Sequence, residues 1–497
     1  MSALPVAPEL VEPVSEWGRL DPRMIIVRPL NELLGLLPAL FALVFLGNVE
    51  TWRVVASVGA VVFVVSYGLF SWLTTKYRIT DNRVELHKGV VFRQKRSIPR
   101  DRIRTVDLTA KLGHRLFGLS AVRVGTGQQE RGAGEGALVL DAVTSAEADR
   151  LRQVLLHRAQ TSVVQERDDG TTIAALDNRW YRYAPLTLSG LLSIGVVVGF
   201  GMNLAHEVNL RFSEVGILRA VFGWLSTAPL TTIIPVVAGL IIVLSVIASL
   251  VGYLLQNHGY RLSRHANGTV HVSRGLLTTR SVSIEEKRLR GVSLYEPILL
   301  RSGGGARLSA VTTGLTKGSN SSLLLPPAPR SEADRVAAEV LGDSPITASL
   351  TAHPVRARSR RLTRAIVPTV ALTGILLILT LTAGWPEWLW VLAAVLVPAF
   401  VLVGLDRYRN LGHALTDRYL VARSGSLTRR TVALQRSGII GWKLRRTLFQ
   451  RRAGVFTLTA ITAAGSGGYR VLDVGEGAGV ELADLAVPGL LGQFLER

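Results

Sequence analysis

The stretch TTIIPVVAGLIIVLSVIASLVGYL, residues 231–254, carries no charged side chain over a length that suits a membrane-spanning helix. A helix needs about 20 apolar residues to cross the hydrocarbon core of a bilayer. Five further stretches also lack Asp, Glu, Lys and Arg, namely Leu33–Val49, Val54–Thr75, Tyr183–His206, Ala365–Pro386 and Trp388–Leu405. Buried helices of a large soluble core are the alternative, but Trp and Tyr residues stand at the edges of the stretches, as they do at membrane interfaces. The sequence therefore predicts six membrane-spanning helices.

The composition of the 497 residues agrees with a membrane protein. Hydrophobic residues make up 48% of the chain and charged residues 19%, and the formal net charge is +21. So many apolar residues exclude a disordered basic protein. The chain has no Cys, which excludes disulfides, zinc–thiolate sites and cysteine nucleophiles.

The six apolar stretches form three closely spaced pairs, and a long polar segment follows each pair. These segments, Thr74–Arg182, Gln256–Arg364 and Asp406–Arg497, hold 20, 17 and 14 basic residues against 13, 7 and 7 acidic ones. Basic flanks of spanning helices stay in the cytoplasm. We therefore expect three transmembrane hairpins, with both termini and all three polar segments on the cytoplasmic side.

Each polar segment begins with a pattern typical of short β-strands. Gly89, Gly275 and Gly425 follow a strand-like run, and each is followed nine residues later by an aliphatic residue, Ile98, Ile284 or Leu434. A glycine at this place suits a turn with positive φ or a β-bulge. Helices are expected at the ends of the segments, at Leu151–Leu156, from Ser331 and from about Val487 to Leu495. Strands followed by one helix predict a small antiparallel sandwich or barrel that its C-terminal helix closes.

Several strings resemble the bacterial pleckstrin-homology-like membrane protein family of the YdbS/YdbT type, in its long three-unit form. They are Arg19-Leu20-x-Pro22, Tyr77-Arg78-Ile79-Thr80, Ile98-Pro99-x-x-Arg102-Ile103, Leu116-Phe117-Gly118-Leu119 and Leu448-Phe449-Gln450-Arg451-Arg452. The second copy departs most, with Leu299-Leu300-Arg301 where the others have Leu-Phe. The resemblance implies a multi-pass protein of the bacterial cell membrane with pleckstrin-homology-like (PH-like) domains, accompanied by a shorter single-unit relative. It implies no settled biochemical activity.

The expected fold is a multi-pass α-helical membrane protein with three cytoplasmic PH-like domains. The expected boundaries are a cytoplasmic N-terminal segment 1–29, transmembrane hairpin 30–73, PH-like domain 74–160, linker 161–182, hairpin 183–255, PH-like domain 256–345, basic linker 346–361, hairpin 362–405 and PH-like domain 406–497. Within the second hairpin, residues 207–225 place Phe212, Leu218 and Leu225 at helical spacing. We expect this amphipathic segment outside the cell, in the membrane interface.

No constellation of residues predicts catalysis, a cofactor or a metal site. The glycines from Gly125 to Gly136 lack the Lys and the following helix of a phosphate-binding loop. His258, His265 and His271 have no Asp or Glu among them and fit a solvated hairpin better than a metal site. The expected hydrocarbon cores of the spans hold no Asp, Glu, Lys, Arg or His, whereas proton-coupled pumps place such groups at the midplane.

Arginine clusters are the remaining signal. We expect contact with anionic headgroups of the inner leaflet from Arg96, Arg100, Arg102, Arg356, Arg358, Arg360, Arg361, Arg445, Arg446, Arg451 and Arg452. The positive-inside bias alone is the competing explanation, and nucleic-acid binding is not expected because stacking aromatics are missing. The predicted function is a non-enzymatic membrane protein that acts as an envelope scaffold or a module binding lipid or protein. A transporter or exporter of lipid-like or peptide substrates is the alternative, followed by a lipid-modifying enzyme.

Overall fold

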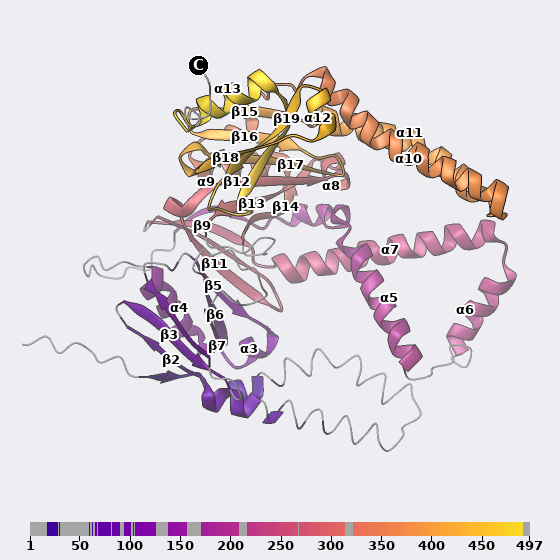
Figure 1. Cartoon of the computed structure of the whole chain (residues 1–497). Helices are drawn as coiled ribbons and strands as arrows, with labels where there is room; N and C mark the ends of the chain where they lie inside the picture. Colours follow the sequence, from indigo (N-terminus) through magenta and orange to yellow (C-terminus); the bar gives the residue numbers. More distant parts are fainter. Residues whose placement is uncertain are drawn as a thin grey trace, which may run out of the picture. The chain divides into compact units, whose positions relative to one another are not determined.

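The computed structural model describes residues 17–27, 29, 59, 62, 65–66, 68–80, 82–89, 94–100, 103, 105–125, 138–156, 170–207, 216–266, 268–313 and 322–490. The chain divides into two compact units (Figure 1). The first comprises Met1–Ser162 with Leu204–Leu210, and the second comprises Val163–Asn203 with Arg211–Arg497. The first unit contains one β-domain, and the second unit contains two, which we call the first, second and third β-domains in chain order.

The first β-domain has two groups of antiparallel strands. Strands β1 (Gly18–Arg19), β2 (Lys76–Ile79), β3 (Arg83–Lys88) and β4 (Gln94–Pro99) form one sheet in that order. Strands β5 (Thr105–Ala110), β6 (Leu119–Gly125) and β7 (Leu138–Thr144) pair in sequence, with the short helix α3 (Leu112–Leu116) between β5 and β6. Helix α4 (Ser145–Leu156) follows, and the Thr144 hydroxyl accepts a hydrogen bond from the Glu147 N–H at 3.3 Å, which caps the start of the helix.

The second β-domain repeats this order. Its strands are β8 (Thr171–Ala175), β9 (Arg261–His265), β10 (Thr269–Arg274), β11 (Thr279–Glu285), β12 (Leu289–Pro297), β13 (Gly305–Thr312) and β14 (Leu323–Pro329). The short helix α8 (Ile298–Ser302) joins β12 to β13, and α9 (Arg330–Leu341) follows β14. Because α9 buries Ala333, Val336 and Val340, it packs on the domain core through one face.

The third β-domain has β15 (Gly412–Leu415), β16 (Tyr419–Ser424), β17 (Thr428–Gln435), β18 (Gly441–Arg445), β19 (Val455–Ile461) and β20 (Gly468–Gly475). The short helix α12 (Leu448–Arg452) joins β18 to β19. Helix α13 spans Glu476–Ala486. Of the helix expected from about Val487 to Leu495, residues 487–490 are not helical and residues 491–495 lie outside the described residues. Helix α13 starts directly after β20. Glu476 lies in its first turn, where the negative charge interacts favourably with the positive end of the helix dipole.

The second and third β-domains share one sheet. Strand β12 pairs with β17, which places Gly291 opposite Leu434 and Glu296 opposite Arg429. The resulting six-stranded sheet has the order β14-β13-β12-β17-β16-β15. Alternate residues of its strands supply two hydrophobic cores, since Ala433 belongs to the core of the second β-domain and Leu434 to that of the third.

The three turn glycines have the backbone that their spacing predicts. The φ angles of Gly89, Gly275 and Gly425 are 138°, 113° and 110°. A Cβ atom on Gly275 or Gly425 would lie 2.0 Å from a carbonyl oxygen, so no other residue fits there.

Three helices are long and apolar enough to cross a membrane in the described residues, rather than the six that the sequence predicts. They are α7 (Leu230–Asn257), α10 (Val355–Ala383) and α11 (Glu387–Arg409). Helix α5 spans Ser189–Glu207, of which Ser189–Gly199 forms a shorter apolar helix among the described residues. Helix α6 (Gly216–Thr227) begins within the expected amphipathic segment. Most of the first expected hairpin, including 30–58, and residues 208–215 lie outside the described residues.

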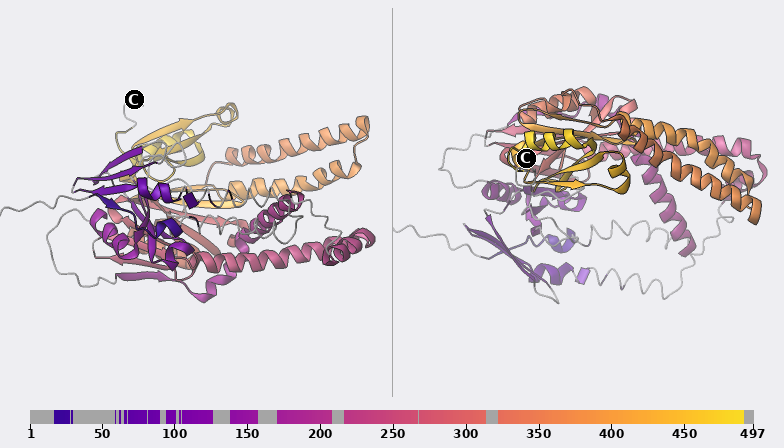
Figure 2. Two further views of the ribbon diagram at one scale, coloured as in Figure 1. Left: turned by 90° about the horizontal axis from the view of Figure 1, so that it is seen from below. Right: turned by 45° about the horizontal axis from the view of Figure 1, so that its top comes forward.

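Helices α10 and α11 lie side by side as an antiparallel hairpin (Figure 2). Gly404 of α11 allows this approach, because a Cβ atom there would lie 3.2 Å from the Cβ of Ala365.

Candidate functional site

An exposed apolar tip stands at the corner between β18 and β19. The Thr447 hydroxyl accepts the Gln450 N–H and the Gln450 side chain accepts the Thr447 N–H at 3.0 Å, which is a capping box that starts α12. The helix turns Leu448 and Phe449 outward, and 74% and 72% of these residues are exposed. Large apolar side chains so exposed mark a surface that meets lipid or protein.

Basic residues surround this tip. Arg445, Arg446, Arg451 and Arg452 are all exposed, and among them Arg446 pairs with Glu476 at 3.1 Å. Gly454 directly follows the corner, and a Cβ atom on it would lie 3.0 Å from Nη1 of Arg356 in the first turn of α10. The tip is therefore next to the base of a candidate spanning helix. We call Arg445, Arg446, Leu448, Phe449, Arg451 and Arg452 the α12 corner.

Two of the predicted lipid-contact residues lie in a buried ion cluster instead. Arg360 and Arg361 of α10 both pair with the carboxylate of Asp473 on β20, Arg361 at 2.5 Å. The Asp473 side chain is 0% exposed, and Gln450 donates to its Oδ1 at 2.8 Å. These contacts fix the base of α10 to the third β-domain and connect it to the α12 corner through Gln450. Arg356 and Arg358 of the same helix are exposed.

Two histidines extend this cluster. His353 Nδ1 lies 3.1 Å from the Asp473 carbonyl oxygen, and His413 Nδ1 lies 3.1 Å from His353 Nε2. Burial lowers the pKa of both imidazoles to about 4, and the positive charge of Arg361 adds to the effect on His353. Both rings are therefore neutral at pH 7, and His353 donates from Nδ1 while it accepts from His413 at Nε2.

The remaining predicted residues belong to the first unit. Arg96 lies on β4 opposite Leu86, and the Arg100 guanidinium donates to the Val154 carbonyl of α4. Arg102 lies outside the described residues. The structure thus gathers Arg356, Arg445, Arg446, Arg451 and Arg452 around one corner, while Arg96 and Arg100 belong to another unit.

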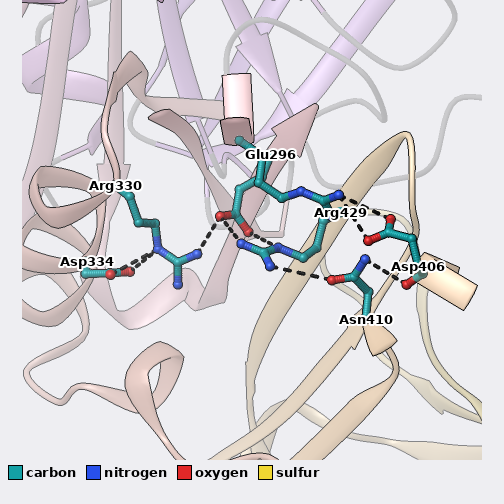
Figure 3. A network of polar contacts seen from close by, with 7 residues as sticks. Glu296, Arg330, Asp334, Asp406, Asn410 and Arg429 are labelled. Carbon is teal, nitrogen blue, oxygen red and sulfur yellow. Dashed lines mark hydrogen bonds and ion pairs between the residues drawn. The ribbon is translucent and has the colours of Figure 1, made fainter. Parts of the chain in front are cut away.

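A second ion network, which the sequence did not predict, joins the second and third β-domains (Figure 3). The Glu296 side chain on β12 is 2% exposed and accepts from Arg330 at 2.6 Å and from Arg429 at 2.7 and 2.8 Å. Burial alone would raise the pKa of Glu296, but the hydrogen bonds and charges of the two arginines outweigh it and hold the pKa below its ordinary value. No local signal could reveal this network, because it depends on the pairing of β12 with a strand more than a hundred residues away.

The same network continues to the base of the helical hairpin. Arg330 also pairs with Asp334 at 2.9 Å, while Arg429 contacts the Asn410 side chain at 3.5 Å. Near them, Arg301 of α8 pairs with Asp406 at the end of α11 at 3.1 Å. The described residues contain no group of three or more side chains that could hold a metal ion.

Comparisons with known proteins agree with this architecture. The family model described as Bacterial PH domain matches three segments, residues 33–159, 211–343 and 365–488. A relative from Bacillus subtilis (strain 168), named UPF0699 transmembrane protein YdbT, is 21% identical over 487 residues, covering 93% of this chain and 96% of the relative. No solved structure matches the chain.

Proposed function

This chain belongs to the bacterial PH domain family, and on that premise we propose that it is a non-enzymatic membrane scaffold whose third β-domain rests on the inner leaflet. It is a transmembrane protein with PH-like domains, and the finer assignments are part of the proposal. They are six spans, β-domains in the cytoplasm, the segment 207–225 in the outer interface, and assembly with a shorter single-unit relative. The first hairpin and α5 would supply the three spans beyond α7, α10 and α11.

The α12 corner is the observation that carries the scaffold proposal. Leu448 and Phe449 are exposed beside four arginines and beside the first turn of α10. Near an anionic leaflet each Arg is worth about 1 kcal/mol. Burying an apolar side chain such as Leu or Phe contributes about 1.5–3 kcal/mol more. Lipid contact by basic and apolar residues together is stronger than by either alone, as in interfacial anchors.

The ion cluster around Asp473 supports the same orientation. Because Arg360 and Arg361 are bound to Asp473, the third β-domain is held at the base of α10. The α12 corner then stays beside Arg356 in the first turn of α10, about 14 Å along the helix axis from Ala365, where the apolar part of α10 begins. We therefore rest the lipid contact on the α12 corner with Arg356 and Arg358, and assign Arg360 and Arg361 to holding the domain in place.

A fluorescent probe on a single introduced cysteine tests the contact in the full chain. The protein has no Cys, so Leu448→Cys gives one labelling site, and Ser437→Cys, exposed at the opposite end of β18, gives the control. In nanodiscs with anionic lipid, brominated lipids should quench the probe at residue 448 and not the probe at residue 437. Raising the salt concentration should reduce the quenching, because it screens the arginine charges.

Neutralisation of the arginines shows whether the quenching at residue 448 depends on their charge or only on the position of the residue near the membrane. Changing Arg445, Arg446, Arg451 and Arg452 together to Gln should abolish the difference between anionic and neutral nanodiscs at residue 448. Equal quenching in anionic and neutral discs before this change, or none in either, would contradict the proposal.

The proposed orientation has its own test in intact cells. Ser226 and Gly384 lie at the outer ends of the second and third hairpins, so Ser226→Cys and Gly384→Cys should react with an impermeant thiol reagent. Ser437→Cys should stay protected until the membrane is opened. Labelling of residue 437 alone on intact cells would reverse the orientation.

A further inference from the structure

Strand β18 occupies the place in the third β-domain that β12 occupies in the second. Both follow a short 3-10 helix, Glu286–Arg288 or Arg436–Gly438. Both are followed by a five-residue helix, directly after β12 and after two residues in the case of β18. Counting back from α8 and α12 makes Gly291 equivalent to Gly441, Val292 to Trp442 and Leu294 to Leu444. The two strands can therefore be compared residue by residue.

The two strands differ in what lies along their outer edge. Strand β12 pairs with β13 on one side and with β17 on the other. Strand β18 pairs with β19 and is the edge of a three-stranded sheet in the part of the chain that the structure describes. Backbone N–H and C=O groups along an unpaired edge form a ready site for another strand.

The missing neighbour leaves apolar side chains of β18 uncovered. Leu294 is 0% exposed, whereas its equivalent Leu444 is 46% exposed, and Ile440 just before β18 is 64% exposed. Trp442 lies on the same face, and its buried Nε1–H has no acceptor among the described residues. In β12 this face is covered by Ala433 and Thr431 of β17.

The opposite face of β18 carries basic residues, which favour acidic residues on any strand that pairs with β18. Lys443 and Arg445 alternate with the apolar residues and are exposed. Residues directly across a strand pair stabilise it when their charges are opposite and destabilise it when they are alike. A matching strand therefore places acidic residues opposite Lys443 and Arg445, and small or apolar residues opposite Trp442 and Leu444.

Neither β4 nor β18 of a second copy meets that requirement. In the first β-domain the strand equivalent to β17 is β4. If β4 of a second copy paired with β18 in the register in which β17 pairs with β12, Lys95 would lie opposite Leu444 and Arg96 opposite Lys443. Pairing β18 with itself would likewise bring basic residues together. Both arrangements oppose like charges.

We propose that the free edge of β18 is a docking site for a β-strand of another protein, one in which acidic and apolar residues alternate. The strand would lie antiparallel to β18, as β17 does to β12, and would extend the sheet β18-β19-β20. This site shares Arg445 with the α12 corner, at the end of β18, but it does not require lipid contact.

The test uses the full chain in nanodiscs of neutral lipid and a dye-labelled eight-residue peptide in which Glu and Val alternate. Fluorescence anisotropy should show binding at least about tenfold tighter than for a peptide with Lys in place of Glu, because two cross-strand charge pairs change sign. A peptide with N-methyl groups along the pairing edge should lose the binding, since it lacks the strand hydrogen bonds.

Charge reversal provides the matched variants. Lys443→Glu with Arg445→Glu should reverse the preference toward the Lys peptide, while Arg470→Glu, an exposed change on β20 of the same sheet, should not. Loss of preference with Arg470→Glu as well would indicate non-specific attraction and overturn the proposal. Absence of binding would also overturn the proposal. Lys443 and Arg445 would then be charged residues that keep an edge strand from pairing with other chains. Disulfides between copies carrying Leu444→Cys would assign the edge to a second copy instead.

Discussion

The corner after β12 and the corner after β18 are built from the same elements and end in different surroundings. In α8, Ile298 and Leu299 are 41% and 38% exposed, and Arg301 is paired with Asp406. In α12, Leu448 and Phe449 are 74% and 72% exposed. No carboxylate among the described residues pairs with the two arginines that follow Phe449.

The residue two positions before the pair of apolar residues in each corner, before Ile298 or before Leu448, explains much of this difference. Glu296 of β12 is buried between two arginines, while its equivalent before α12 is Arg446, which is exposed. The acidic residue turns the second corner into a joint between domains. The basic residue leaves the third corner as a surface, so one repeat serves two purposes through a change of charge.

The largest effect is expected from removing the acidic residue of the joint. Glu296→Ala leaves the partly buried Arg330 and Arg429 without the buried carboxylate that they share, and should lower the free energy of unfolding by about 3 kcal/mol or more. Arg446→Ala, at the equivalent position, should change it by less than about 1 kcal/mol because its ion pair is exposed. Denaturant unfolding of the full chain in detergent measures both, and equal losses would show that the two corners do not differ as described.

The next largest effect on stability is expected from the difference between the covered edge of β12 and the uncovered edge of β18. Leu294→Ala should lower the free energy of unfolding by about 3 kcal/mol, because the side chain is fully buried and leaves a cavity. Leu444→Ala should lower it by about 1 kcal/mol, since the side chain is already half exposed. The same unfolding measurement applies, and a loss at Leu444 as large as that at Leu294 would mean that the edge of β18 is covered within the chain.

Acid should weaken the third β-domain through its two buried histidines. His353 and His413 have pKa values of about 4 in the folded protein and bind protons more readily when unfolded, near pH 6.5. Stability is therefore fully present above pH 6.5 and falls as the pH falls, by about 2 kcal/mol at pH 5 for one such histidine. The first and second β-domains have Tyr77 and Tyr260 at the place of His413. Thermal unfolding against pH should show a smaller slope in His413→Gln.

The smallest effect on stability is expected at the α12 corner. Phe449→Ser should change the free energy of unfolding by no more than about 0.5 kcal/mol, because the ring is exposed. It should nevertheless reduce the lipid quenching of a probe at residue 448. Leu299→Ser in α8 is the control and should leave that quenching unchanged; an equal reduction would remove the distinction between the corners.

Local patterns predicted much of each domain and nothing of the joint. The nine-residue spacing after Gly89, Gly275 and Gly425 predicted the turns, because only glycine adopts the required φ without strain. Apolar length predicted α7, α10 and α11. The sharing of a sheet between two domains follows from contacts distant in sequence, so alternation within β12 could not reveal β17 as its partner.

The site was predicted in part for the same reason. Clustered arginines drew attention to α10 and the α12 corner, yet sequence could not separate Arg358, which is exposed, from Arg360, which is buried. The difference depends on Asp473, more than a hundred residues further along the chain. Burial of an arginine is decided by the presence of such a carboxylate rather than by the cluster itself.

The pairing of β12 with β17 also has a consequence for how the protein is made. Glu296 and Arg429 are 133 residues apart in the chain, and the hairpin of α10 and α11 lies between them. At a synthesis rate of about 5–20 residues per second, β12 waits on the order of ten seconds for the strand that covers it. During that time the second β-domain has an open edge like that of β18, while the hairpin enters the bilayer. A nascent chain stalled just after α11 should therefore bind holding chaperones more than one stalled after β17 has left the ribosome.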